Sequence, residues 1–323
     1  MRVFICDIIK LMEMYLMIEA YEKINEITNN NLLYNTDILI DKKLIDDINQ
    51  DGVIYDKEKI EDLDKYYINP NIKDYEYLIN KYKKNIVILK QDELIKLYNY
   101  IAENIKYYKV NKKQFININL DNILNKNELY QKYKDKIIMH LDVKIKGYRT
   151  IYLPIKNECH IFGNYSNTLK DLIFIFHELG HSFQLVSTSK IHFDYTIAEI
   201  YACINEILMS KSTNYFDDTI KLINNKILES ICTFDFYNYL YNLEEFNVNK
   251  IDLEWENIHN KYGVPFKSMK WLTDFNSMLN PQNIISYTIA YIISLNYIKK
   301  SYKDFKNICK SNITLDEIIN LSS

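Results

Sequence analysis

Residues 168–183 read TLKDLIFIFHELGHSF, and this stretch decides the fold. Thr168 is followed three residues later by Asp171. This pair signals a helix start, because each side chain can accept a hydrogen bond from the other residue's backbone N–H. The apolar run after Asp171 predicts that one side of the helix is buried and that its histidines face a cleft. We therefore expect a helix that continues over 172–186.

This helix carries the motif His177-Glu178-Leu179-Gly180-His181, which has the form HExxH. Residues four apart lie on one helix face, so His177 and His181 can bind the same metal ion. Glu178 projects beside the metal, where it can act as a general base on a water molecule. The motif predicts one zinc ion per chain, since imidazole and carboxylate donors suit zinc best.

A catalytic zinc site usually has three protein ligands and keeps a fourth position for water or substrate. Glu199 lies 18 residues after His181, and Glu206 lies seven residues further on. Seven residues are about two helical turns, so both carboxylates share one face of a helix expected over 195–210. We expect Glu199 to be the third ligand and Glu206 to orient a ligating histidine. The alternative for Glu206 is a solvated helix charge.

The remainder of the chain favours helices. Only 5 Gly and 4 Pro occur in 323 residues, too few for the many turns of an all-β protein. Short β-prone runs before the metal helix predict a small sheet or hairpin. These runs cover residues 137–139, 143–145, 150–153 and 160–162. The predicted fold is mainly α, a helical zinc-peptidase domain with a small sheet and an active site in a cleft.

Two regions are expected along the chain: an N-terminal helical region, 1–135, and a catalytic region, 136–323. The first of them shows an apolar stripe at helical spacing from Ile8 to Ile18. Turn signals divide the helices of both regions. They lie at residues 29–31, 51–52, 69–71, 262–265 and 280–281.

Charge and cysteine content limit the partners. Forty basic and 43 acidic residues give a net charge of -3, with no basic stripe of the kind that binds nucleic acid. Five widely spaced Cys, with no CxxC pair, favour reduced thiols and a cytoplasmic location. Cys203 is interpreted as a buried packing thiol. No uncharged apolar run reaches about 18 residues, so no membrane span is expected.

The motif and its flanks resemble the oligoendopeptidase F and thimet oligopeptidase family of zinc metallopeptidases, which have the HExxH…E pattern of gluzincins. The resemblance rests on residues 163–171, 176–183 and 194–199. It implies a mostly helical peptidase with a deep channel that cleaves short peptides at internal bonds. This chain is about half the family's customary length, so much of the channel cover must be abbreviated.

In that family the strand before the metal helix binds the substrate backbone. The resemblance therefore implies that residues 159–163 bind substrate, with His160 and Gly163 among the contacts. His192, in the loop between the two ligand helices, is a further candidate to line the cleft.

The family also places a histidine and tyrosines near the substrate carbonyl and the developing oxyanion. Tyr287 and Tyr291 stand at matching offsets, whereas Gln282 occupies the position of the histidine. A phenol can donate a hydrogen bond to a tetrahedral intermediate. The resemblance thus implies that Tyr287 or Tyr291 stabilises the oxyanion and that Gln282 contacts substrate.

The predicted function is zinc-dependent hydrolysis of internal bonds in short peptides. Glu178 would take a proton from the zinc-activated water and pass it to the leaving amine. Two alternatives stay open: a dedicated processing peptidase for one leader or signalling peptide, and a non-catalytic zinc-containing module that binds peptides. A general base such as Glu178 argues against the last, because structural zinc needs none. The oligomeric state is open.

Overall fold

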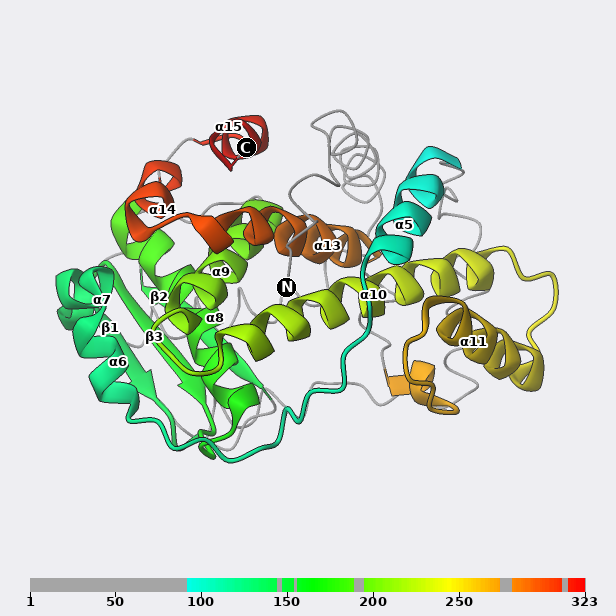
Figure 1. The fold of residues 1–323 in the computed structure, drawn as a ribbon, viewed down its shortest axis with the longest axis horizontal. Coiled ribbons are helices and arrows are strands. Elements are labelled where there is room, and N and C mark those ends of the chain that lie inside the picture. Colours follow the sequence, from blue (N-terminus) through cyan, green and yellow to red (C-terminus); the bar gives the residue numbers. More distant parts are fainter. Residues whose placement is uncertain are drawn as a thin grey trace. The chain divides into compact units, whose positions relative to one another are not determined.

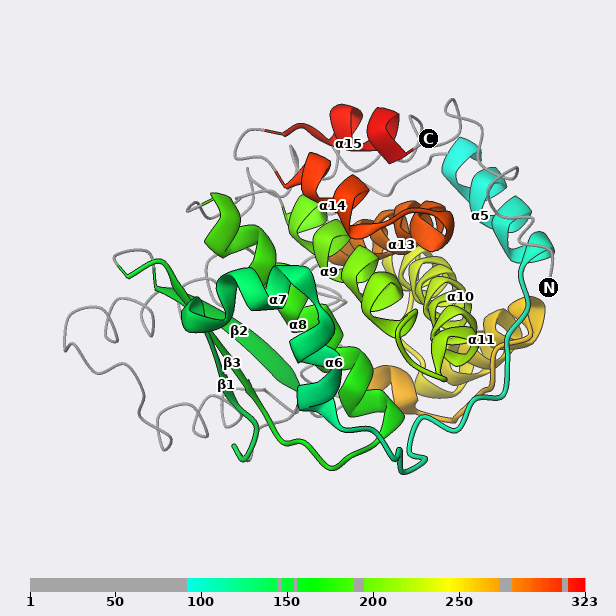
Figure 2. The ribbon, with the colours of Figure 1, turned by 60° about the vertical axis from the view of Figure 1, so that its left-hand side comes forward.

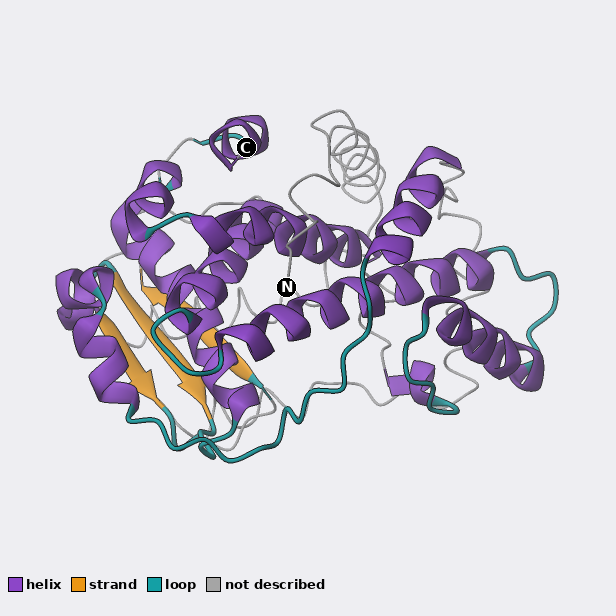
Figure 3. Cartoon of the chain, in the orientation of Figure 1, coloured by secondary structure: helices purple, strands orange, loops and turns teal. Residues whose placement is uncertain are grey.

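A computed structural model describes residues 92–143, 147–153, 156–188, 195–273, 281–309 and 313–322 (Figure 1). Predictions for the first 91 residues lie outside these ranges, including the stripe from Ile8 to Ile18 and the turn signals at 29–31, 51–52 and 69–71. Within the ranges the chain is mainly helical with one small sheet (Figure 3), which confirms the predicted fold class. No described helix is long and apolar enough to cross a membrane.

Helices make up most of the described ranges. The α-helices are α5 Asp92–Asn104, α6 Leu120–Lys126, α7 Glu128–Tyr133, α8 Leu169–Thr188, α9 Tyr195–Ser210, α10 Phe216–Tyr241, α11 Val248–Tyr262, α13 Pro281–Leu295, α14 Tyr302–Ile308 and α15 Leu315–Ser322. The strands are β1 Ile137–His140, β2 Tyr148–Leu153 and β3 Glu158–Gly163. Short 3-10 helices cover Lys134–Lys136, Lys270–Thr273 and Asn296–Lys299.

The sheet has three described strands in the order β1-β3-β2. β3 lies in the middle, parallel to β1 and antiparallel to β2. Three of the four predicted β runs are therefore strands. The fourth, 143–145, is not a strand where it is described: Val143 lies outside the strands and donates its N–H to the carbonyl of Gly163 at 3.0 Å, and residues 144–145 are not described.

One face of the sheet packs against α8 (Figure 2). Cys159 and Ile161 of β3 are fully buried, and the Cys159 thiol lies 3.8 Å from the carbonyl of Ser182 on α8. On β2 the ring of Tyr148 contacts Phe174 of α8. Side chains alternate along a strand, so His160 and its other even-numbered neighbours on β3 point to the opposite face.

The start of α8 matches the prediction. The Asp171 carboxylate accepts hydrogen bonds from the Thr168 backbone N–H at 3.2 Å and from the Thr168 hydroxyl at 2.7 Å. In return, the Asp171 N–H donates to the Thr168 hydroxyl at 3.3 Å. The two side chains thus cap the helix end as a pair. The predicted helix over 195–210 is also present, as α9.

Gly180 permits a close contact between α8 and α9. A Cβ atom at this position would lie 2.6 Å from Ala202 Cα and 2.7 Å from the carbonyl oxygen of Tyr201. A side-chain amide bridges the helices nearby, because Asn205 Nδ2 donates to the carbonyl of Phe176 at 2.6 Å. The glycine inside the HExxH motif is thus required by packing between the two helices.

Gly180→Ala is expected to lower the free energy of unfolding by about 1–3 kcal/mol, because the added methyl group must push the helices apart. Urea denaturation followed by circular dichroism measures the loss. Ser187→Ala is the control, since Ser187 is half-buried and its hydroxyl bonds within α8, to the carbonyl of Gln184 at 3.0 Å. An unchanged midpoint for Gly180→Ala would mean that the helices separate without cost.

The described residues divide into two compact units. One contains 92–108, 223–273 and 281–289, and the other contains the sheet, α8, α9 and the C-terminal residues from Ala290. Helices α10 and α13 contribute residues to both units. The expected division into 1–135 and 136–323 stays a prediction.

The first unit has an aromatic core of its own. Tyr98 meets Phe234 edge to face with ring centroids 5.0 Å apart, and Phe236 meets Trp255 at 4.7 Å. At the C-terminus of α11, Gly263 adopts a φ of 65°, a left-handed conformation that favours glycine. This residue ends α11 where the turn signal at 262–265 predicts a break.

Candidate metal centre

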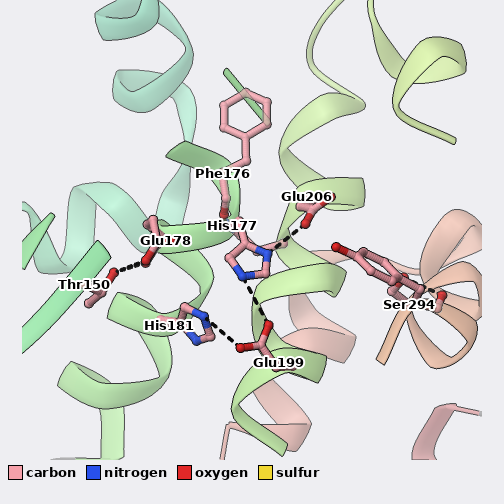
Figure 4. A network of polar contacts seen from close by, with 10 residues as sticks. Thr150, Phe176, His177, Glu178, His181, Glu199, Glu206 and Ser294 are labelled. Atoms are coloured by element: carbon pink, nitrogen blue, oxygen red, sulfur yellow. Dashed lines mark hydrogen bonds and ion pairs between the residues drawn. The ribbon is translucent and has the colours of Figure 1, made fainter. Parts of the chain in front are cut away.

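The three predicted ligands come together between α8 and α9 (Figure 4). His177 Nε2 lies 3.2 Å from one carboxylate oxygen of Glu199, and His181 Nε2 lies 3.8 Å from the other. The two imidazole rings stand edge to face with centroids 4.9 Å apart. Each histidine therefore points its Nε2 atom toward the same carboxylate.

Because this cluster is buried, its carboxylate needs a compensating partner. Glu199 is 4% exposed and His177 is 8% exposed. A buried carboxylate is stable only with a positively charged or hydrogen-bonding partner, which here is either a proton on an imidazole or a cation. Two imidazoles and one carboxylate are the donor set of many catalytic zinc sites, so the residues fit the metal that the motif predicts.

Glu206 hydrogen-bonds with His177. Its carboxylate is 0% exposed, and its Oε1 lies 2.8 Å from Nδ1 of His177. A carboxylate can only accept, so Nδ1 carries the proton and Nε2 is left for a metal. The contact expected from the spacing is present, and the alternative of a solvated charge is wrong.

The charges of the cluster shift the pKa values of the two histidines in opposite directions. Burial alone would lower the pKa of His177, but hydrogen bonds to Cys203, Glu199 and Glu206 outweigh it and raise this pKa well above its ordinary value. The pKa of His181 is lowered, mainly by burial and despite the attraction of Glu199. In the protein without a metal ion, His177 is therefore protonated in preference to His181.

The carboxylate of Glu178 points toward Thr150 of the sheet (Figure 4). Its Oε2 accepts a hydrogen bond from the Thr150 hydroxyl of β2 at 2.7 Å. Glu178 itself is mostly buried. Sequence reasoning missed Thr150. The sequence does place Thr150 in a β-prone run. Its contact with Glu178, however, depends on which face of the sheet packs against α8.

The Cys203 thiol lies closer to His177 and Glu199 than packing alone requires. Donor atoms of His177, Glu199 and Cys203 all lie within 4.8 Å of one another. Burial raises the pKa of this thiol to about 12, so it is protonated in the metal-free protein. Its interaction with His177 lowers this pKa, but burial outweighs that effect. The structure thus offers a thiol as a further donor beside the predicted ligands.

Tyr291 lies next to this thiol. It is 5% exposed, and Cys203 is among the groups that raise the pKa of its phenol. Burial, followed by the charge of Glu206, raises the pKa of the phenol well above its ordinary value. The phenol is therefore neutral and able to donate. Tyr287 belongs to the other compact unit, and the part of either tyrosine in stabilising an oxyanion stays a prediction.

The role expected for residues 159–163 needs correction. β3 is paired on both sides, so its backbone groups are used within the sheet and cannot pair with a peptide. Packing explains the glycine at position 163, since a Cβ there would lie 2.2 Å from the Tyr148 ring. Within the described sheet β2, not β3, lies at an edge.

The position of His160 also does not suit contact with a substrate. It is 2% exposed and lies on the sheet face opposite α8, where its Nδ1 is 3.0 Å from Nε2 of His140 and its ring stacks near Phe162. The remaining predicted contacts, His192 and the side chain of Gln282, lie outside what the structure describes.

No protein-family model matches the sequence, and no curated protein matches it either. The fold does resemble solved structures. A protein of Bacillus anthracis strain Ames described as an oligoendopeptidase F matches with a TM-score of 0.50 and 16% identity, over 82% of this chain and 54% of that one. Another structure described as oligoendopeptidase F matches with a TM-score of 0.53 and 14% identity, over 78% of this chain and 54% of that one.

These likenesses establish the fold. The resemblance seen around the HExxH motif is confirmed at the level of architecture, that of the oligoendopeptidase F structures. The chain spans about half the length of those structures, 54% in each case.

Proposed function

We propose that the chain is a zinc-dependent endopeptidase that hydrolyses internal bonds of short peptides. The observation that carries the proposal is the convergence of His177, His181 and Glu199, with the carboxylate of Glu178 on the same helix turn. The fold shared with oligoendopeptidase F structures supports it. One zinc ion per chain, held by these three side chains, would act as a Lewis acid that activates water and polarises the scissile carbonyl.

The chain's own residues would do the remaining work. Glu178 accepts a proton from the attacking water and delivers it to the leaving amine. Glu206 keeps the Nδ1 proton of His177 in place, which fixes the orientation of that ring. Tyr287 or Tyr291 is proposed to donate to the developing oxyanion. His192 and Gln282 are proposed to contact the peptide.

A cytoplasmic location is part of the proposal. The cysteines of the described ranges, Cys159, Cys203, Cys232 and Cys309, are all free thiols. Free thiols are usual in a reducing compartment. The proposed partner is a peptide, with neither nucleic acid nor membrane involved.

The decisive test joins metal content with cleavage of a quenched fluorescent peptide library, with and without a chelator. We expect one zinc per chain and internal cleavage of many peptides that chelation abolishes and added zinc restores. One zinc with cleavage of a single peptide class would identify a dedicated processing peptidase. One zinc without any cleavage would identify a peptide-binding module, and a chain without zinc would contradict the proposal.

A further inference from the structure

We propose that Thr150 is a positioning residue, which holds the carboxylate of Glu178 so that one chosen oxygen receives the proton of the attacking water. The inference rests on the proposed function and extends it to a residue of the sheet. Thr150 belongs to neither helix that carries the metal ligands, so its part in the site follows only from the folded structure.

The hydrogen-bond geometry selects the acceptor of the threonine proton. The Thr150 hydroxyl lies 2.7 Å from Glu178 Oε2 and 3.1 Å from the Glu178 carbonyl oxygen. A hydroxyl has one proton, and a charged carboxylate is the stronger acceptor. The carbonyl already accepts from the Ser182 hydroxyl at 3.0 Å. The threonine proton therefore belongs to Oε2.

This bond distinguishes the two oxygens of the carboxylate. With Oε2 held by Thr150, rotation of the carboxylate would break a charge-assisted hydrogen bond. Oε1 is then the oxygen left to take a proton from water. A base that is already oriented does not need to be ordered during the reaction, and this lowers the barrier.

The sheet makes the hydroxyl a rigid support. Thr150 pairs with Ile161 of β3 in the antiparallel register, which fixes its backbone. Its β-branched side chain has few χ1 rotamers, so the hydroxyl keeps its direction. Its neighbours on the same strand face are anchored as well: the Tyr148 hydroxyl donates to the Asn164 carbonyl at 3.1 Å, and the Tyr152 hydroxyl donates to Asn157 at 2.9 Å.

Thr150→Val and Thr150→Ser separate the hydroxyl from the shape of the side chain. We expect the valine variant to lose about 10–100-fold in kcat, with KM within about twofold and one zinc retained, as outer-shell changes at metal sites do. The serine variant should stay within about threefold of the unmodified chain, because it keeps the donor. Thr233→Val is the matched control, since the Thr233 hydroxyl bonds only a backbone carbonyl, that of Glu229 at 2.8 Å, in the contacts described.

Two kinetic results would overturn the inference: a valine variant within about twofold of the unmodified kcat, or a serine variant as slow as the valine one. A valine variant that loses zinc or stability together with activity would overturn it as well. A crystallographic measurement on the zinc-loaded proteins separates this inference from the proposed function. If the unmodified chain cleaves no peptide, the proposed function fails. The orienting effect of Thr150 on the carboxylate then stands if the Glu178 carboxylate leaves its single orientation in Thr150→Val, and it falls if the carboxylate is unmoved.

Discussion

Glu178→Gln is expected to reduce kcat/KM by about 1,000-fold or more while one zinc per chain is retained. An amide has nearly the shape of the carboxylate but cannot accept the proton of the attacking water. The amide oxygen can still accept from the Thr150 hydroxyl, so the local structure should persist. Steady-state kinetics on a library-derived peptide, together with zinc analysis of the same sample, measures both quantities.

Glu103→Gln provides the control for Glu178, because Glu103 is an exposed residue of α5 and the same chemical change there should leave the kinetics unchanged. If Glu178→Gln loses zinc together with activity, Glu178 is a ligand and not the base. If the variant keeps its activity, another group takes the proton.

Glu199→Ala is expected to leave less than about a tenth of the sites loaded after dialysis, whereas Cys203→Ala should keep one zinc per chain. Removal of Glu199 takes away the only negative charge in a three-ligand site and leaves two imidazoles, which bind zinc far more weakly. Cys203 has a donor atom within the same 4.8 Å cluster, so the two variants decide between the donor sets. Elemental analysis of dialysed protein gives the metal content.

Cys232→Ala, which removes another fully buried thiol, shows what the loss of a buried thiol does by itself. Circular dichroism must show native helix content for every variant compared. Loss of zinc from Cys203→Ala, with Cys232→Ala still loaded, would assign the site to His177, Glu199 and Cys203 instead.

The two site helices could be predicted from the sequence because their signals are local. Thr168 and Asp171 mark the start of α8, and four-residue spacing places His177 and His181 on one face. The seven-residue spacing from Glu199 likewise predicts that Glu206 orients a ligating histidine, and the structure shows that this histidine is His177. The positions of these residues on their own helices need only helix geometry.

The sheet could be predicted in less detail, because the order of the strands and the face that packs against α8 depend on residues distant in sequence. The sequence indicates β runs but not that β3 lies between its two neighbours. That order removes residues 159–163 from the role of peptide-binding strand, and strand alternation turns His160 away from α8. The same order brings Thr150 to Glu178, a contact 28 residues apart in sequence.

The interactions of His177 with Cys203, Glu199 and Glu206 would couple loading of the proposed metal site to acidity. Since the pKa of His177 is raised well above its ordinary value, the metal-free side chain holds a second proton at neutral pH. A divalent ion bound at Nε2 in the proposed site would displace that proton, so its affinity would rise about tenfold per pH unit until the pH passes this pKa. The same raised pKa stabilises the metal-free fold below the unfolded pKa of histidine, and this stabilisation is lost as the pH rises through the folded pKa. In the proposed zinc site, acid would thus favour the protonated, unloaded protein and alkali the loaded one.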